Sequence, residues 1–317
     1  MAELFVYTRC EFAKLKRKPL FLVLAASSVL LPLAFALFLA DPPDSETAVI
    51  QSMATMIQLS AYLVLIPAVA VLASHLLFAE QDYDTMKNLA CVPVGRGMLA
   101  VCKLLGMLLF AVLFMAAGAL VTLFLLLCQG WEPAGYWPLF AVCLGQGVLM
   151  WAGALPCILL VVLLNKSYIL SVIITFFYTM VNYIVPTALP GLTAVPLGFN
   201  AGTLIPGALS LRWYTPFLSP GEQPPLVQMI LEHAVSTPAA FGISALEAVF
   251  WTALIAWAYR RQEAWKEVLI HAYISHRMAQ TAPLPDPAGR RGRAGPLPAG
   301  AVRHPAHHGA GTARPQL

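Results

Sequence analysis

The chain has 317 residues, and its composition excludes a water-soluble fold. Apolar residues make up 59% of it and charged residues only 11%, whereas soluble domains carry about 25% charged residues. A soluble fold this poor in charge would expose apolar patches large enough to cause aggregation. The composition therefore predicts an integral membrane protein. The net charge of +4 is informative only through its distribution along the chain.

The first segment, residues 1–18, has the pattern of an amphipathic helix. Phe5, Thr8, Phe12 and Leu15 recur at helical spacing, and the charged residues between them can reach water. Such a helix can lie in the membrane interface with its basic groups toward anionic headgroups. The pattern favours a cytoplasmic interfacial helix, and a solvated leader helix is the alternative.

Six apolar runs follow, and a helix needs about 20 such residues to cross a bilayer. The first run stops at Asp41, the second contains only His75 as an ionisable group, and the last contains a single charge, Glu247. The sequence therefore predicts an all-α integral membrane protein with a transmembrane domain over residues 19–260. The six predicted spans are 19–40, 55–79, 104–127, 137–164, 167–187 and 238–259.

The basic residues predict the orientation of the spans. Six spans place both termini on one side, and of the 19 Lys and Arg residues all but Arg212 fall on that side. The opposite side carries mostly acidic residues. Because Lys and Arg accumulate on the cytoplasmic side of membrane proteins, we expect both termini to be cytoplasmic.

The loop between the second and third spans combines acidic and basic groups in a defined order. Its acidic residues come first and its basic residues follow, which suits a short cytoplasmic helix aligned with its own dipole. A polar residue can cap that helix, a proline would end it, and long basic side chains can snorkel at the mouth of the third span. An ordinary charged loop is the alternative. The residues concerned are Glu80, Asp82, Asp84, Thr85, Lys87, Pro93, Arg96 and Lys103.

A long segment before the last span stays apolar but is rich in proline and glycine. Straight spanning helices do not tolerate this density of helix breakers over residues 186–237. We predict an external re-entrant segment there, with a short external helix over 224–235 that begins at a proline. Beyond the last span, we predict a cytoplasmic helical extension over 261–278. The Pro-, Ala-, Gly- and Arg-rich residues 279–317 are predicted to be disordered.

The sequence contains no recognisable catalytic motif. It lacks a phosphate-binding Gly-x-x-x-x-Gly-Lys-Ser/Thr loop, a His-Glu-x-x-His motif and a Gly-x-Ser-x-Gly motif. The cysteines have neither metal-type spacing nor the arrangement of a disulfide framework, so we interpret them as small buried hydrophobes. They are Cys10, Cys91, Cys102, Cys128, Cys143 and Cys157. We predict no catalytic site, no metal site and no cofactor bound by this chain.

Glu247 lies roughly ten residues into the last predicted span. A charge near the membrane midplane costs about 3 kcal/mol on insertion scales, so an intramembrane carboxylate is by default a functional hypothesis. Gln146 and Asn182, in the fourth and fifth predicted spans, are its candidate partners. These three residues are candidates for a translocation pathway, and a protonated or hydrogen-bonded structural Glu247 is the alternative.

The order of these parts resembles that of ABC-2 type export permeases. Those proteins have an amphipathic cytoplasmic helix, six spans, a coupling helix between spans two and three, and a re-entrant element before the last span. Their loop signature runs Glu, three residues, Gly-Thr, one residue, Lys, and later Pro, Arg and Lys. This chain carries Asp84 at the position of the usual glycine. The other signature positions are Glu80, Thr85, Lys87, Leu89, Pro93, Arg96 and Lys103.

The resemblance implies a division of labour between subunits. A separate ATPase would bind ATP and magnesium and grip the 80–96 loop, while two permease chains would form one pathway in a bacterial plasma membrane. Within the group, the chain is most similar to permeases of bacitracin or lantibiotic self-protection, which suggests an amphipathic cargo. No nucleic acid is expected as a partner. The alternatives are an ATPase-independent carrier or membrane enzyme that uses Glu247, and a membrane anchor that does not transport.

Overall fold

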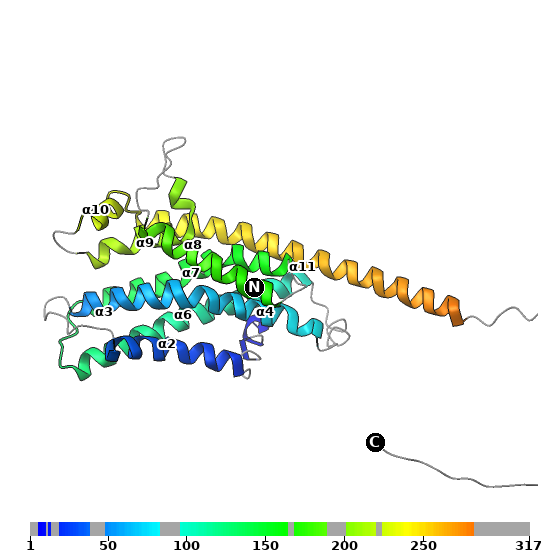
Figure 1. Cartoon of the computed structure of the whole chain (residues 1–317), viewed down its shortest axis with the longest axis horizontal. Coiled ribbons are helices and arrows are strands. Elements are labelled where there is room, and N and C mark those ends of the chain that lie inside the picture. Colours follow the sequence, from blue (N-terminus) through cyan, green and yellow to red (C-terminus); the bar gives the residue numbers. More distant parts are fainter. Residues whose placement is uncertain are drawn as a thin grey trace, which may run out of the picture. The chain divides into compact units, whose positions relative to one another are not determined.

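The computed structural model describes residues 6–10, 12–13, 19–38, 48–82, 96–163, 168–188, 201–219 and 224–281. Every regular element in these ranges is a helix, which confirms the predicted all-α class (Figure 1). The chain divides into two units, Met1–Lys266 and Glu267–Leu317. The first unit contains every described helix except the C-terminal part of the last one, which continues into the second unit.

The helices come in the following order along the chain. They are α2 (Pro19–Phe38), α3 (Ala48–Met56), η1 (Ile57–Leu65), α4 (Ile66–Asp82), α6 (Arg96–Cys128), α7 (Tyr136–Leu163), α8 (Tyr168–Ala188), η3 (Ala201–Leu204), α9 (Pro206–Leu218), α10 (Pro225–Leu231) and α11 (Thr237–Thr281).

Five helices are long and apolar enough to cross a membrane, and together they confirm an integral membrane protein. These spans are Ala48–Leu77, Gly97–Cys128, Tyr136–Leu163, Leu170–Thr187 and Thr237–Arg261. They overlap the last five predicted spans. The first predicted span coincides with α2, whose apolar stretch over the residues searched is the shorter Pro19–Ala34. Six spans therefore stay a prediction.

The second predicted span is one continuous helix from Ala48 to Asp82, built from α3, η1 and α4. Its middle section, η1, is a π-helix of nine residues. Such segments are rare, usually last a single turn, and occur frequently at functional sites. The buried side chains of η1 include Ser60 and Tyr62, so this section brings polar groups into the bundle.

Helix α7 lies at the centre of the bundle, where it contacts α3, η1, α4, α6, α8 and α9. Most of its length is buried, as expected for a helix that is apolar all round. In contrast, α8 and α11 expose much of their apolar surface. On α11 this surface includes Leu246, Val249, Phe250 and Trp257. In a bilayer, such side chains can face the hydrocarbon without cost.

The segment before the last span contains η3, α9 and α10 among its described residues. Helix α9 is buried along most of its length and packs against α7 and α8. Helix α10 falls within the range predicted for a short external helix, and a proline precedes it. The re-entrant path across the membrane stays a prediction. In α11 the helix continues without interruption through the predicted extension over 261–278.

Candidate functional site

The start of α9 is held by two side chains from other helices. The backbone N–H of Gly207 donates to Asn182 Oδ1 of α8 at 3.1 Å, and the Tyr62 hydroxyl of η1 donates to the Gly207 carbonyl oxygen at 3.1 Å. The first N–H groups of a helix have no partner inside it. Ile205, at the N-cap of α9, supplies no side-chain cap. Asn182 therefore caps α9 from a different helix.

Glycine is required where α9 meets α8. A β-carbon at Gly207 would overlap the carbonyl oxygen of Asn182. A second close approach joins α7 and α9, because a β-carbon at Gly153 would lie 2.7 Å from Cβ of Pro206. The Tyr178 hydroxyl of α8 donates to the Gly153 carbonyl oxygen at 2.5 Å. The α9 N-terminus thus fits closely against two spans.

A further side-chain contact joins α9 to α7, one turn beyond Gly207. Gln146 Nε2 donates to the Ser210 hydroxyl. We call Tyr62, Gln146, Asn182, Gly207 and Ser210 the α9 anchor. All five are buried, so their hydrogen bonds are shielded from competition with water.

Two buried polar atoms beside these contacts have no hydrogen-bond partner in the described part of the chain, Gln146 Oε1 and the Tyr214 hydroxyl. The Tyr62 ring packs between Tyr183 and Tyr214, with centroid distances of 6.1 Å and 6.4 Å. The members of the α9 anchor are uncharged and both donate and accept hydrogen bonds, so they are suited to positioning a helix.

Two of the three residues predicted to line a translocation pathway contact the same helix, α9. Gln146 and Asn182 both contact α9, and Asn182 Nδ2 also donates to the Tyr178 carbonyl oxygen at 3.0 Å. Glu247 is half-buried on α11, within electrostatic range of the Tyr178 phenol. A pathway role for the three residues stays a prediction.

At the opposite end of the bundle, Lys103 joins three helices. Its side chain lies on α6 and is completely buried. The Nζ atom donates to the Leu76 carbonyl oxygen of α4 at 2.8 Å and lies 5.7 Å from the ring centroid of Tyr259 on α11. The Arg260 guanidinium packs beside Gly97, where it would meet an added β-carbon. This end of α6 is therefore in contact with α4 and α11.

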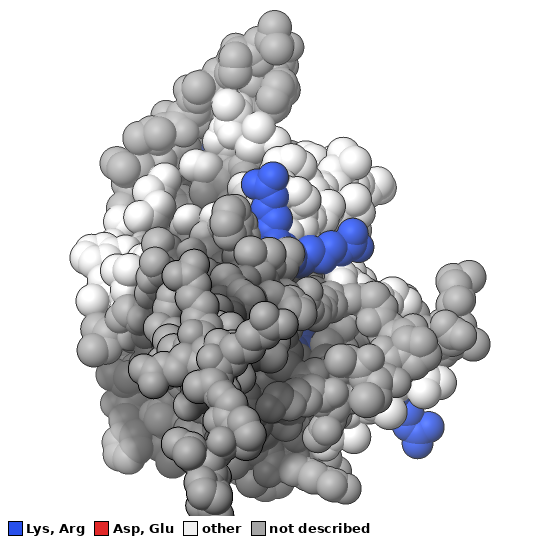
Figure 2. All heavy atoms as spheres, turned by 90° about the vertical axis from the view of Figure 1, so that its right-hand side faces the viewer, with Lys and Arg blue, Asp and Glu red and all other residues white. Residues whose placement is uncertain are grey.

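The other predicted coupling residues lie at or beyond the edges of the described structure. Glu80 and Asp82 are in the last turn of α4, and Arg96 is the first residue of α6. Asp84, Thr85, Lys87 and Pro93 lie outside the described residues. Figure 2 looks onto this end of the helices, and the described charged side chains visible there are Lys or Arg. Their role in coupling stays a prediction.

Sequence reasoning missed three members of the α9 anchor: Tyr62, Gly207 and Ser210. The sequence contained one indication of Tyr62. It lies close to Gln58 and Ser60 inside a predicted span, and polar residues within spans mark functional positions. Gly207 follows Pro206 in the Pro- and Gly-rich segment 186–237, where proline and glycine indicate only that a straight spanning helix is interrupted. Which side chain such a glycine meets depends on the tertiary structure.

A family model described as ABC-2 family transporter protein matches residues 8–182, more than half of the chain. The chain therefore belongs to the ABC-2 transporter family. No curated protein matches it. The matched range runs from the N-terminal segment through α8 and includes the loop between α4 and α6. The protein is a multi-pass membrane permease of an ABC transporter.

Proposed function

We propose that this chain is the permease subunit of an ATP-driven exporter, coupled to a separate ATPase subunit that binds ATP and magnesium. Two permease chains, identical or different, form the pathway between them in a bacterial plasma membrane. The family match supports this division of labour, as does a sequence without a phosphate-binding loop. The proposed cargo is a peptide antibiotic or another amphipathic compound, as in bacitracin or lantibiotic self-protection.

One structural observation carries the coupling mechanism. Tyr62 and Asp82 lie on one continuous helix, whose far end leads into the loop proposed to contact the ATPase. They are separated by roughly 30 Å at about 1.5 Å of rise per residue. A displacement of Asp82 along the helix axis would therefore reach the hydrogen bond between Tyr62 and Gly207. We propose that ATPase closure moves α9 in this way.

The test of the ATPase partner is a pull-down of the tagged chain from detergent-solubilised native membranes. Wild-type protein is expected to co-purify with an ATPase, and a Glu80→Ala, Arg96→Ala double variant is expected to lose it. Glu232→Gln, which changes an exposed carboxylate distant in sequence from the 80–96 loop, serves as the control and should retain the ATPase. Absence of any ATPase from the wild-type sample, under conditions that preserve other ABC complexes, would contradict the proposal.

The proposed path through Tyr62 has its own test. Tyr62→Phe removes the hydroxyl that bonds to Gly207, so ATPase binding should remain while ATP-driven export falls. Tyr183→Phe removes a hydroxyl from the neighbouring ring and leaves the Gly207 bond in place. Equal export by the two variants would show that the Tyr62 bond transmits nothing.

An ATPase-independent carrier that uses Glu247 predicts different results. Transport would persist in vesicles without ATP and would stop in a Glu247→Gln variant of normal abundance. If the chain belongs to an ATP-driven exporter, transport should require ATP in the wild type and in the Glu247→Gln variant. If Glu247→Gln leaves transport and protein level unchanged, Glu247 has no role in the pathway.

A further inference from the structure

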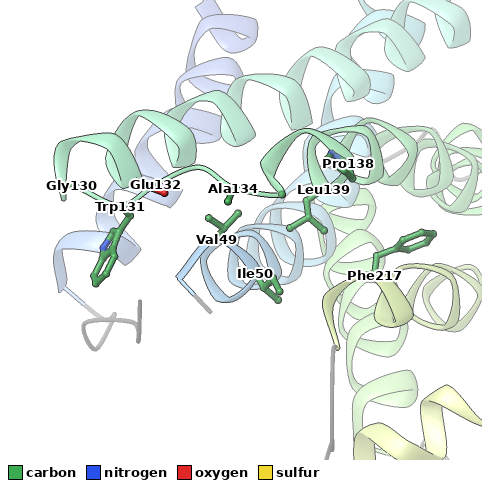
Figure 3. Close-up of a pocket in the computed structure, with 10 residues that line it drawn as sticks. Val49, Ile50, Gly130, Trp131, Glu132, Ala134, Pro138, Leu139 and Phe217 are labelled. Carbon is green, nitrogen blue, oxygen red and sulfur yellow. The ribbon is translucent and has the colours of Figure 1, made fainter. Parts of the chain in front are cut away.

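A pocket of about 660 Å³ opens at the end of the bundle that carries α10, away from Lys103. It lies between the first turn of α3, the connection from α6 to α7, and the last turn of α9 (Figure 3). Its volume falls in the range of small-molecule sites, about 300–1,000 Å³. The pocket lies outside the α9 anchor and outside the predicted coupling loop.

The walls of the pocket are apolar and its rim carries a carboxylate. Val49 and Ile50 come from α3, Leu139 from α7 and Phe217 from α9. Trp131 and Glu132 come from the α6–α7 connection (Figure 3). This combination of aliphatic and aromatic walls with a single charged group is typical of a site that binds an apolar body and orients it through one polar contact.

The pocket is reached from water rather than from the hydrocarbon of the membrane. Glu132, Ala134 and Gly135 line it and are exposed. They lie in an irregular connection between two spans, and irregular backbone exposed to lipid does not occur within the hydrocarbon region. A molecule in the aqueous phase can therefore meet these residues directly.

The charge at this end favours a cation. Glu132 lines the pocket and is exposed, whereas Arg212 is buried and donates from Nη1 to Thr203 Oγ1 at 2.8 Å. An exposed carboxylate beside a low-dielectric cleft attracts counter-ions to it. A positively charged ligand is therefore electrostatically complementary to the rim.

We infer that this pocket binds a soluble cationic amphipathic molecule, with its apolar group between Ile50, Leu139 and Phe217 and its positive charge beside Glu132. The inference deepens the proposed export function by naming a chemical class of cargo. Binding to the permease chain needs no ATPase, so it can be tested separately from coupling. The pocket would hold the compound on the predicted external side of the membrane. From there the compound could dissociate into the aqueous phase or bind to the pocket again.

The test measures binding of radiolabelled tetraphenylphosphonium, a soluble cation with an apolar body, to the full chain in phosphatidylcholine nanodiscs. Empty nanodiscs report partition into lipid, and triphenylphosphine oxide is the uncharged comparison. Glu132→Gln removes the rim charge, Ala134→Trp fills the pocket from its exposed side, and Glu232→Gln removes an exposed carboxylate that does not line the pocket. Size-exclusion profiles confirm that each variant is folded.

Saturable binding above empty nanodiscs is expected for the wild type and for Glu232→Gln. Glu132→Gln should weaken it about two- to fivefold, the range of a solvent-exposed ion pair, and Ala134→Trp should abolish it. The inference is overturned if wild-type binding does not exceed that of empty nanodiscs, which is the result expected if lipid fills the pocket. It is also overturned if the uncharged compound binds equally well, or if Glu132→Gln matches Glu232→Gln. Any of these results would leave the pull-down of the ATPase unaffected.

Discussion

Asn182 of α8 accepts a hydrogen bond from the backbone N–H of Gly207 at 3.1 Å and thereby caps a helix to which it does not belong. The carbonyl group of the same glycine accepts a hydrogen bond from Tyr62. The backbone N–H and carbonyl groups of Gly207 are thus hydrogen-bonded to side chains from two different spans. The position of α9 therefore depends on the relative placement of α8 and η1, and a movement of either span must stretch or break one of these bonds.

The capping bond predicts a specific cost for Asn182→Ala. The substitution leaves the buried Gly207 N–H without its partner, which should destabilise the protein by about 1–2 kcal/mol. Thermal unfolding of the purified protein in detergent measures the effect as a lowered midpoint. Thr187→Ala is the control, because Thr187 bonds only to carbonyl groups of its own helix. Equal midpoints for the two variants would contradict a cap at Asn182.

The close approach at Gly207 predicts that even one methyl group is too large there. Gly207→Ala places a β-carbon against the Asn182 carbonyl oxygen, and overpacking of this kind costs about 1–3 kcal/mol. In Gly106→Ala, by contrast, the added β-carbon meets no atom within 4 Å. That control should be neutral or stabilising, since alanine is a better helix former than glycine. The same unfolding measurement compares them, and similar behaviour would rule out a tight contact at Gly207.

The burial of Lys103 predicts that the protein is strongly destabilised when the charge at this position is reversed. Lys103→Glu would place a buried carboxylate beside the Leu76 carbonyl oxygen, and an unpaired buried charge is among the most destabilising changes. We expect the yield of monodisperse protein to fall at least several-fold in fluorescence-detected size-exclusion chromatography. Arg9→Glu makes the same charge change at an exposed position and should leave the yield close to wild type. A normal yield of Lys103→Glu would show that the Lys103 side chain is not buried between the helices.

Two exposed cysteines allow the predicted orientation to be tested. Cys10 precedes α2 and Cys128 ends α6, and both are exposed free thiols, whereas Cys102, Cys143 and Cys157 are buried. In intact cells a membrane-impermeant maleimide should label a variant that retains Cys128 as its exposed thiol and should spare one that retains Cys10. In both variants Cys91, which lies outside the described residues, is replaced by alanine. After the cells are opened, both should react, and labelling in the reverse pattern would invert the topology.

Much of the architecture follows from local sequence. The transmembrane helices were predictable because a run of about 20 apolar residues has one favourable structure in lipid, whatever its neighbours. The second predicted span ends at 79, whereas α4 continues to Asp82. The cysteines were predicted to be buried, which is correct for Cys102, Cys143 and Cys157 and wrong for Cys10 and Cys128, which are exposed. By contrast, residues 83–95 lie outside the described structure, and their predicted coupling role rests on the family resemblance.

The contacts between helices were decided only by the tertiary structure. The sequence indicated that Gln146 and Asn182 were unusual in a membrane and that Glu247 needed a partner, but it paired these residues with one another. In the folded chain Gln146 and Asn182 meet α9 instead, because Pro206 and Gly207 allow its backbone to approach α7 and α8 closely. Local patterns determine which residues are placed in lipid. Which polar groups then satisfy one another depends on how the spans pack, since each buried donor pairs with whatever acceptor the packing brings within reach.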